Sequence, residues 1–215
     1  MMKTTEIILI RHGETAANSR HIIQGQTDTL LNETGEQQAE LIAERLRDME
    51  FAAIYASDLK RAMRTAEAIA RPHGCAVIPC PGLREWHLGA WQGKTAGEIA
   101  GLYPDEYRNF LQDSPETHIT GGESRREFQQ RISKTLVSLA QRHSGGRILL
   151  VSHGGVIGMI LRHVLHAEQL AFSHRPRTEN ASFSKVLFFE DGTWQLACWN
   201  DISHLRGTVN DAGKW

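Results

Sequence analysis

Apolar and polar positions alternate along the chain in blocks that predict strands and helices in turn. Two runs of aliphatic residues, Ile7–Ile10 and Ile148–Val151, have the pattern of strands that are buried on both faces. Apolar residues at helical spacing predict helices over about 35–48, 57–70, 123–141 and 156–166. Further strands are predicted at 53–56, 76–78, 183–190 and 194–200.

Strands that alternate with helices are typical of an α/β protein with a largely parallel sheet. Asp191-Gly192 between the last two strands is a hairpin signal, so the sheet is expected to be mixed. No linker or repeat divides the chain, and we predict one domain over 1–215, a three-layer α/β/α sandwich. Residues 86–122 are less regular and predict a partly helical insertion, which either covers a substrate or packs its aromatic residues into the core.

Composition narrows the class of protein. With 24 basic and 25 acidic side chains, the net charge of -1 argues against non-specific partnership with nucleic acid or membrane. Three cysteines without paired spacing favour a reduced compartment, and the apolar N-terminal run is too short for a signal peptide. We therefore expect a cytoplasmic protein. Its oligomeric state is left open, a homodimer included.

Both long aliphatic runs end on a histidine. The first continues as Arg11-His12-Gly13, and the second continues as Ser152-His153-Gly154. Because ligands of open α/β sheets bind beyond the carboxyl ends of the strands, the two imidazoles are expected in one site. Gly154 would open the following helix, whose free amide groups favour an anion.

Other residues fit an anion site less specifically. If Ser57 or Asp58 caps the next helix, Arg61 falls in its first turn, where a bound anion would offset its repulsion by the helix dipole. The alternative is that Arg61 points into solvent. Asn18 and the backbone around Gln24-Gly25 could add further donors, and the alternative is that Asn18 and Gln24 are ordinary polar loop residues.

Glu85 stands beside Trp86 and close to Trp91 in the sequence. Aromatic surroundings disfavour the charged form of a carboxyl group, as a general acid requires, although a surface glutamate is the plainer alternative. Two histidines and a glutamate could also bind zinc. Arginines beside them disfavour a cation, so we expect neither a metal nor another cofactor.

These motifs, taken in order, resemble the histidine phosphatase superfamily, the phosphoglycerate-mutase-like family. The matching segments are Arg11-His12-Gly13-Glu14-Thr15, Ser57-Asp58-Leu59 with Arg61, Leu83-Arg84-Glu85, Gly121-Gly122-Glu123-Ser124 and Ser152-His153-Gly154. The tail from Asn200 to Leu205 is similar to that of the cobalamin-pathway and broad-specificity phosphatases.

The resemblance implies metal-independent catalysis with His12 as the nucleophile that forms a phosphohistidine. It implies that Arg11, Arg61 and His153 hold the phosphoryl oxygens and that Glu85 donates the proton. The pocket for phosphate or substrate would be lined by Asn18, Gln24, Gly25 and Gly154.

The resemblance leaves three activities open. A phosphomonoesterase acting on a small phosphorylated metabolite is favoured, because mutases of this family typically carry a tandem arginine before the Glu-Ser motif. Between Pro104 and Thr120 there is only Arg108, and Arg125-Arg126 follows the motif, as expected for solvated charges on a helix. A cofactor-dependent phosphoglycerate mutase is the alternative, and a phospholigand-binding module without catalysis is a third.

Overall fold

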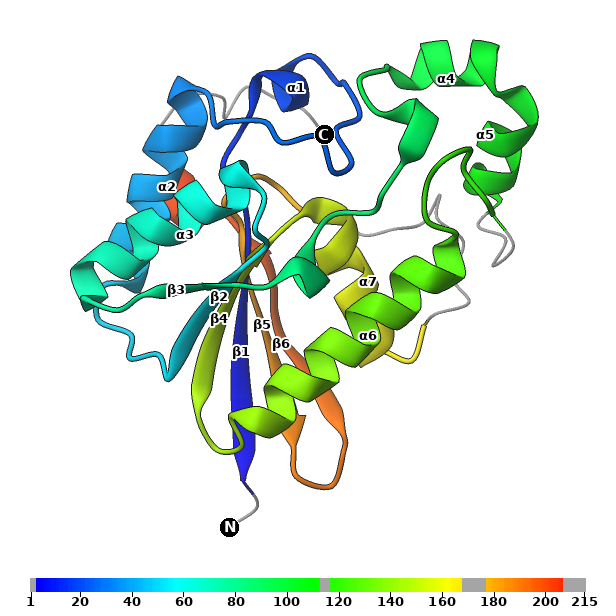
Figure 1. Ribbon diagram of the computed structural model, residues 1–215. Coiled ribbons are helices and arrows are strands. Elements are labelled where there is room, and N and C mark those ends of the chain that lie inside the picture. The colour runs from blue at the N-terminus through cyan, green and yellow to red at the C-terminus, as the bar shows by residue number, and fades with distance from the viewer. Residues whose placement is uncertain (1–2, 113–116, 168–176, 207–215) are drawn as a thin grey trace.

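A six-stranded mixed sheet runs through the protein with the strand order β3-β2-β4-β1-β5-β6 (Figure 1). The computed structural model describes residues 3–112, 117–167 and 177–206. The strands are β1 (Thr4–Arg11), β2 (Ala53–Ala56), β3 (Val77–Pro79), β4 (Arg147–Ser152), β5 (Phe183–Phe189) and β6 (Trp194–Asp201). β1 to β4 are parallel, whereas β5 is antiparallel to both of its neighbours, as the predicted hairpin requires.

Helices cover both faces of the sheet, with α2 and α3 on one side and α6 and α7 on the other (Figure 1). The helices are α1 (Ala16–Ser19), α2 (Glu33–Leu46), α3 (Lys60–His73), α4 (Ala96–Leu102), α5 (Pro104–Leu111), α6 (Arg125–Arg142) and α7 (Gly154–Val164). Short 3₁₀ turns lie at η1 (Pro81–Leu83), η2 (Gly89–Trp91) and η4 (Ser203–Leu205). Within the described ranges, none of the helices combines the length and the apolar character needed to cross a membrane.

The two cores lie on opposite faces of β1. Ile8 and Ile10 pack with the apolar residues of α2 and α3, and Ile7 and Leu9 pack with those of α6 and α7. Successive side chains of a strand point to opposite faces, so four consecutive aliphatic residues serve both cores. Each such side chain stabilises the fold by about 1.5–3 kcal/mol relative to an exposed one. The predicted three-layer α/β/α sandwich is confirmed.

The register of β1 and β4 sets the place of the two histidines. Arg11 is the register partner of Ser152, at the last position of both strands. His12 and His153 are the next residues, so both leave the same edge of the sheet. The amide group of His12 donates to the carbonyl of Ser152 (2.9 Å), which continues the pairing one residue further.

Two local predictions are wrong. Helix α3 begins at Lys60 with Leu59 as N-cap, and neither Ser57 nor Asp58 caps it. The reason is that Asp58 forms a double hydrogen bond with Arg84, while the hydroxyl group of Ser57 contacts His153. Of the two arginines at the start of α6 that were predicted to be solvated, Arg126 is exposed, whereas Arg125 is buried at 3% exposure.

The segment between η1 and α6 forms the predicted partly helical insertion, which contains α4 and α5 (Figure 1). Its two tryptophans are buried within the core. Trp86 stacks on Phe128 of α6 with ring centroids 5.1 Å apart, and Trp91 contacts Tyr107 and Phe110. These two tryptophans therefore pack into the core, which is the second of the two alternatives for the aromatic residues of this segment.

Candidate active site

His12 and His153 lie against each other at the carboxyl edge of the sheet. Their ring centroids are 5.1 Å apart and the rings meet edge to face. Both side chains are buried, at 3% and 0% exposure. The expected convergence of two imidazoles that are far apart in the sequence is therefore what the fold produces.

A hydrogen bond determines which nitrogen of His12 carries the proton. Nδ1 lies 2.7 Å from the carbonyl oxygen of Gly13, and a carbonyl can only accept, so Nδ1 is the donor. In the neutral ring the lone pair is then on Nε2. Burial lowers the pKa of His12 well below its usual value, and the charges of Arg61 and Arg11 lower it further.

His153 has the opposite tautomer. Arg61 Nε, which can only donate, lies 3.2 Å from Nδ1, so Nδ1 is the acceptor and Nε2 carries the proton. Nε2 donates to the hydroxyl group of Ser57 at 2.8 Å. Burial is the largest cause of the lowered pKa of His153, followed by the charge of Arg61. Two neutral imidazoles thus lie side by side, one with a free lone pair and one with an N–H.

Arg61 is buried in the site, at 1% exposure, and does not point into solvent. Its two terminal nitrogens donate to the carbonyls of Thr27 and Gly25, each at 2.7 Å. These bonds and the one to His153 fix the plane of the guanidinium group. Burial lowers the pKa of Arg61 to about 10, partly offset by the negative charges of Glu85 and Asp28.

The segment before β5 forms hydrogen bonds with Arg11 and with the backbone of His12. Arg11 Nη1 donates to the carbonyl of Thr178 at 2.5 Å. Asn180 Nδ2 donates to the carbonyl of His12 at 2.9 Å. No motif in the sequence marks these residues as part of the site. The one indication is that they lead directly into a core strand, β5.

The loop residues predicted to line the site have mainly local bonds. Asn18 closes the capping box of α1 with Thr15, and Gln24 Oε1 accepts from the hydroxyl groups of Thr15 and Thr29. Gly25 has a positive φ of 51°, and its carbonyl accepts from Arg61. Asn18 Oδ1 also lies 3.4 Å from Asn180 Nδ2, which connects this loop to the segment that holds His12.

Glu85 approaches the same place from the insertion. Its Oε2 accepts from the amide group of Gly155 (2.9 Å), in the first turn of α7, and its Oε1 accepts from the amide group of Trp86 (2.9 Å). The carboxyl group therefore stands at the positive end of α7. Gly154 is the first residue of that helix, and a β-carbon there would lie 3.4 Å from Arg11 Nε.

The charges at this edge suit a small oxyanion. Two guanidinium groups and the N-terminus of α7 surround the neutral imidazoles, and the carboxyl group of Glu85 lies at that end of α7. Among the described residues, no group of three His, Cys, Asp or Glu side chains is placed to hold a metal ion.

Comparison with known proteins identifies the family. The model of the histidine phosphatase superfamily (branch 1) matches residues 7–202. A metal-independent phosphoserine phosphatase from Arabidopsis thaliana is 40% identical over 206 residues, which are 94% of this chain and 84% of the relative. A probable phosphoglycerate mutase, GpmB, from Erwinia tasmaniensis is 36% identical over 212 residues, 96% of this chain and 97% of the relative.

Solved structures agree. Phosphoserine phosphatase from Entamoeba histolytica in complex with 3-phosphoglyceric acid has a TM-score of 0.84 at 32% identity, covering 94% of this chain and 99% of that one. The alpha-ribazole phosphatase from Shigella flexneri has a TM-score of 0.81 at 26% identity, with coverage of 91% and 96%. The chain belongs to the histidine phosphatase superfamily, branch 1, as its motifs predicted.

Proposed function

We propose that this protein is a metal-independent phosphomonoester hydrolase that forms a phosphohistidine on His12 and acts on a small phosphorylated metabolite. The single observation that carries the proposal is the tautomer of His12. With Nδ1–H held by Gly13 at 2.7 Å, the Nε2 lone pair faces a site lined by Arg11, Arg61 and His153. A neutral, oriented imidazole is the form that attacks phosphorus.

In the first step His12 Nε2 attacks the phosphorus atom in line with the ester oxygen. The N–P bond forms as the P–O bond to the alcohol breaks, and Glu85 gives its proton to the departing oxygen. Each oxygen of the Glu85 carboxyl group accepts one amide hydrogen bond, which leaves a second lone-pair direction for that proton.

In the second step the Glu85 carboxylate takes a proton from water, and the water oxygen attacks the phosphorus atom. The P–N bond breaks, the electron pair returns to His12 Nε2, and inorganic phosphate leaves. The protonated Glu85 is thereby regenerated, so both protons and the imidazole are accounted for over one turnover.

Arg11, Arg61 and His153 would bind the three equatorial oxygens of the phosphoryl group. Fixed N–H donors around these oxygens stabilise the charge that spreads over them in the transition state. Bonds from Arg61 to two carbonyls and to His153 support this role, because a preset guanidinium needs no reorganisation when substrate binds. Gly154, Asn18, Gln24 and Gly25 would line the remaining pocket.

The test is hydrolysis of p-nitrophenyl phosphate in excess EDTA. We expect turnover to persist with the chelator and to be abolished by His12→Ala. A phosphorylated enzyme should be trapped from ³²P-labelled substrate by quenching with detergent at alkaline pH, and its label should be acid-labile and base-stable. Activity that disappears with EDTA, or no trapped label across a panel of phosphorylated metabolites, would contradict the proposal, and the second result would favour a binding module.

A phosphoglycerate mutase is the second candidate, because several relatives are named as probable phosphoglycerate mutases. A mutase must return the phosphoryl group to a bound phosphoglycerate before water reaches it. The region before the Glu-Ser motif offers only Arg108, which is exposed and paired with Asp105. Interconversion of 2- and 3-phosphoglycerate that is faster than release of phosphate would establish the mutase.

A further inference from the structure

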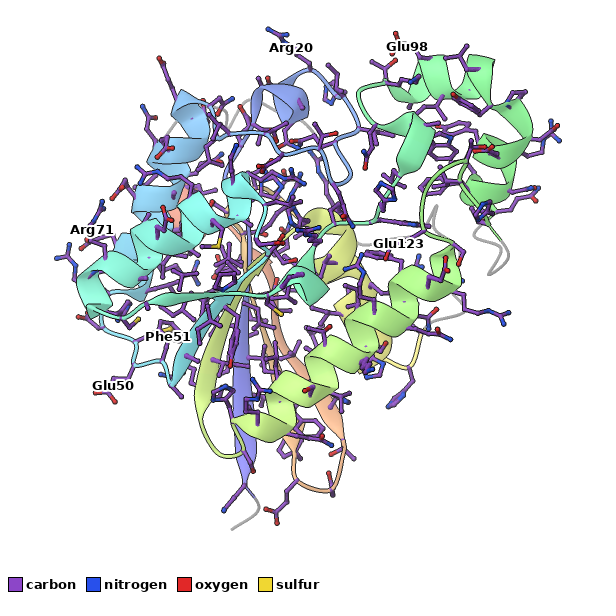
Figure 2. The ribbon with its side chains drawn as sticks, viewed as in Figure 1. Arg20, Glu50, Phe51, Arg71, Glu98 and Glu123 are labelled. Carbon is purple, nitrogen blue, oxygen red and sulfur yellow. The ribbon has the colours of Figure 1, made fainter. Side chains whose placement is uncertain are left out.

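One ion pair outside the site holds the backbone around Glu85. Arg131, in the second turn of α6, binds Glu123 with two parallel hydrogen bonds of 2.7 Å, from Nε to Oε1 and from Nη2 to Oε2. Glu123 stands just before the N-cap of α6, at the end of the helix that faces the insertion (Figure 2). Glu123 belongs to the Gly121–Ser124 motif, and the two side chains bond to each other and to the loop around Glu85, not to the imidazoles.

The remaining donors of Arg131 point at the Glu85 loop. Nη1 donates to the carbonyls of Gly82 (3.1 Å) and Arg84 (2.8 Å), and Nη2 donates to the carbonyl of Glu85 itself (3.2 Å). A single guanidinium group thus binds three carbonyls within four residues. Only arginine presents enough N–H groups in a fixed plane to do this.

Glu123 holds the other side of the same loop. Its Oε2 accepts from the amide group of His87 (3.0 Å), and its backbone carbonyl accepts from the indole N–H of Trp86 (2.9 Å). The backbone is therefore fixed both before and after Glu85. Arg131 also lies 5.2 Å from the ring centroid of Phe128, which stacks on Trp86, so the aromatic core supports the pair.

The pair is shielded, with side-chain exposures of 22% for Arg131 and 21% for Glu123. Bidentate pairs in this setting are stronger and more rigid than exposed ones. Removing either partner would leave the charge of the other without its counter-ion in this shielded position. A glutamine in place of Glu123 would turn an N–H₂ group toward either the amide of His87 or the guanidinium group.

We propose that Arg131 and Glu123 are positioning residues that aim the carboxyl group of Glu85 at the leaving-group oxygen. This inference rests on the proposed function, in which Glu85 is the general acid. The ion pair touches neither substrate nor the reacting atoms. It acts by fixing the main chain from Gly82 to His87, so that the Glu85 side chain leaves the loop toward the N-terminus of α7.

The consequence is selective, because the proton matters more for some leaving groups than for others. p-Nitrophenolate is a stable anion and departs without a proton, whereas phenolate and alkoxides need one. A displaced acid therefore lowers kcat/KM more for phenyl phosphate than for p-nitrophenyl phosphate. General loss of structure would lower both alike.

The experiment compares kcat/KM for a series of substituted phenyl phosphates in Glu123→Gln, Arg131→Lys and Glu85→Gln. Arg147→Lys is the matched control, because Arg147 pairs with Glu6 at similar exposure (34% and 29%) at the opposite end of β1 and β4. We expect both pair variants to lose about 10–100-fold on phenyl phosphate and a few-fold on p-nitrophenyl phosphate, in the direction of Glu85→Gln. Two pair variants are made so that the test stands if one fails to fold.

Equal losses for all leaving groups in the pair variants, or losses matching those of Arg147→Lys, would overturn the inference while the proposed function stood. If Glu85→Gln itself showed no dependence on the leaving group, the assignment of Glu85 would fall and the inference with it. Retained stabilisation of the pair variants by inorganic phosphate would show that the phosphate site is intact.

Discussion

His12 and His153 meet edge to face with ring centroids 5.1 Å apart, and each has a polar partner that fixes its tautomer. The carbonyl of Gly13 holds the proton of His12 on Nδ1, and Arg61 Nε keeps Nδ1 of His153 unprotonated. One ring therefore presents a lone pair and the other has an N–H on Nε2. In the proposed mechanism, two identical side chains would supply a nucleophile and a donor, because their second nitrogens have different neighbours.

Substitution of the two histidines should have unequal effects. His12→Ala removes the nucleophile and should abolish both turnover and the ³²P-phosphoenzyme. His153→Ala removes one donor to the phosphoryl oxygens and should lower kcat/KM about 10²–10³-fold, with the phosphoenzyme still formed. His166→Ala, at an exposed position beyond the end of α7, is the control and should leave both measurements unchanged. A phosphoenzyme in His12→Ala would contradict the assignment.

The pH profile should report the neutral histidines. Burial and the adjacent guanidinium groups lower the pKa of both His12 and His153 well below 6.5. The nucleophile should therefore remain unprotonated as the pH falls through 6.5. We measure kcat/KM for p-nitrophenyl phosphate and correct it for ionisation of the substrate. The decrease that protonation of these imidazoles causes should occur only below that pH. A loss centred at pH 6.5, traced to His12 by NMR titration of the ring, would contradict the electrostatics of the site.

Arg61→Lys should impair both binding and stability although the charge is kept. A lysine has one nitrogen and cannot reach the carbonyls of Gly25 and Thr27 and the ring of His153 together. Buried acceptors that lose their donor cost about 1–3 kcal/mol, measurable as the free energy of unfolding in urea. Stabilisation by inorganic phosphate should also decrease. Arg64→Lys on the exposed face of α3, where Arg64 pairs with Glu36, is the control.

Gly155→Ala tests the contact between α7 and Glu85. A β-carbon at Gly155 would lie 2.3 Å from Glu85 Oε1, so the carboxyl group would have to move. Gly158→Ala in the same helix meets nothing within 4 Å. Alanine favours a helix over glycine by about 1 kcal/mol in both cases. We expect Gly158→Ala to gain stability at full activity, and Gly155→Ala to lose activity toward phenyl phosphate. Equal activity of the two variants would contradict this contact.

His204 should make stability depend on pH. Its Nε2 donates to the carbonyl of Ala181 (3.0 Å) while Nδ1 accepts from Arg45 (3.1 Å), so the ring is held neutral. Burial and the charge of Arg45 lower its pKa from 6.5 to about 4, although Asp201 opposes this. Between these pH values the unfolded chain is protonated and the native protein is not. The contribution of neutral His204 to the free energy of unfolding is therefore complete above pH 6.5 and is lost as the pH falls toward 4.

The measurement is the free energy of unfolding between pH 7 and pH 4. The slope of the free energy of unfolding against pH reports the number of protons taken up on unfolding. In His204→Gln that number should fall by up to one, because glutamine can make both bonds without titrating. His12 and His153 contribute to the remaining slope. An unchanged slope in His204→Gln, with His166→Gln as the exposed control, would show that His204 is not held neutral.

The alternation of patterns predicted most of the fold, because strand and helix periods are local properties of the chain. β2 lies at Ala53–Ala56 as predicted, and the hairpin at Asp191-Gly192 joins β5 and β6. The same local signal placed His12 and His153 at strand ends. The alternation predicted a largely parallel sheet, and the pairing of β1 with β4 in the structure brings the two histidines together.

The beginning of α3 shows where local signals fail. Ser57 and Asp58 are good capping residues, yet both side chains are taken by partners from distant segments, His153 and Arg84. A side-chain bond over such a separation has no signature in composition or spacing. Arg125 is a second such position, because a charge at the start of a helix is expected in solvent whereas this one is buried.

The sequence by itself determined the strands, the helices and the two histidines at one edge of the sheet, since these follow from the spacing of apolar residues. Only the tertiary structure decided that Arg61 is buried against Gly25 and Thr27, that Asn180 holds the carbonyl of His12, and that Arg131 holds the Glu85 loop. Those contacts join segments distant in the chain, and they exist only once both cores have packed and set the segments in place.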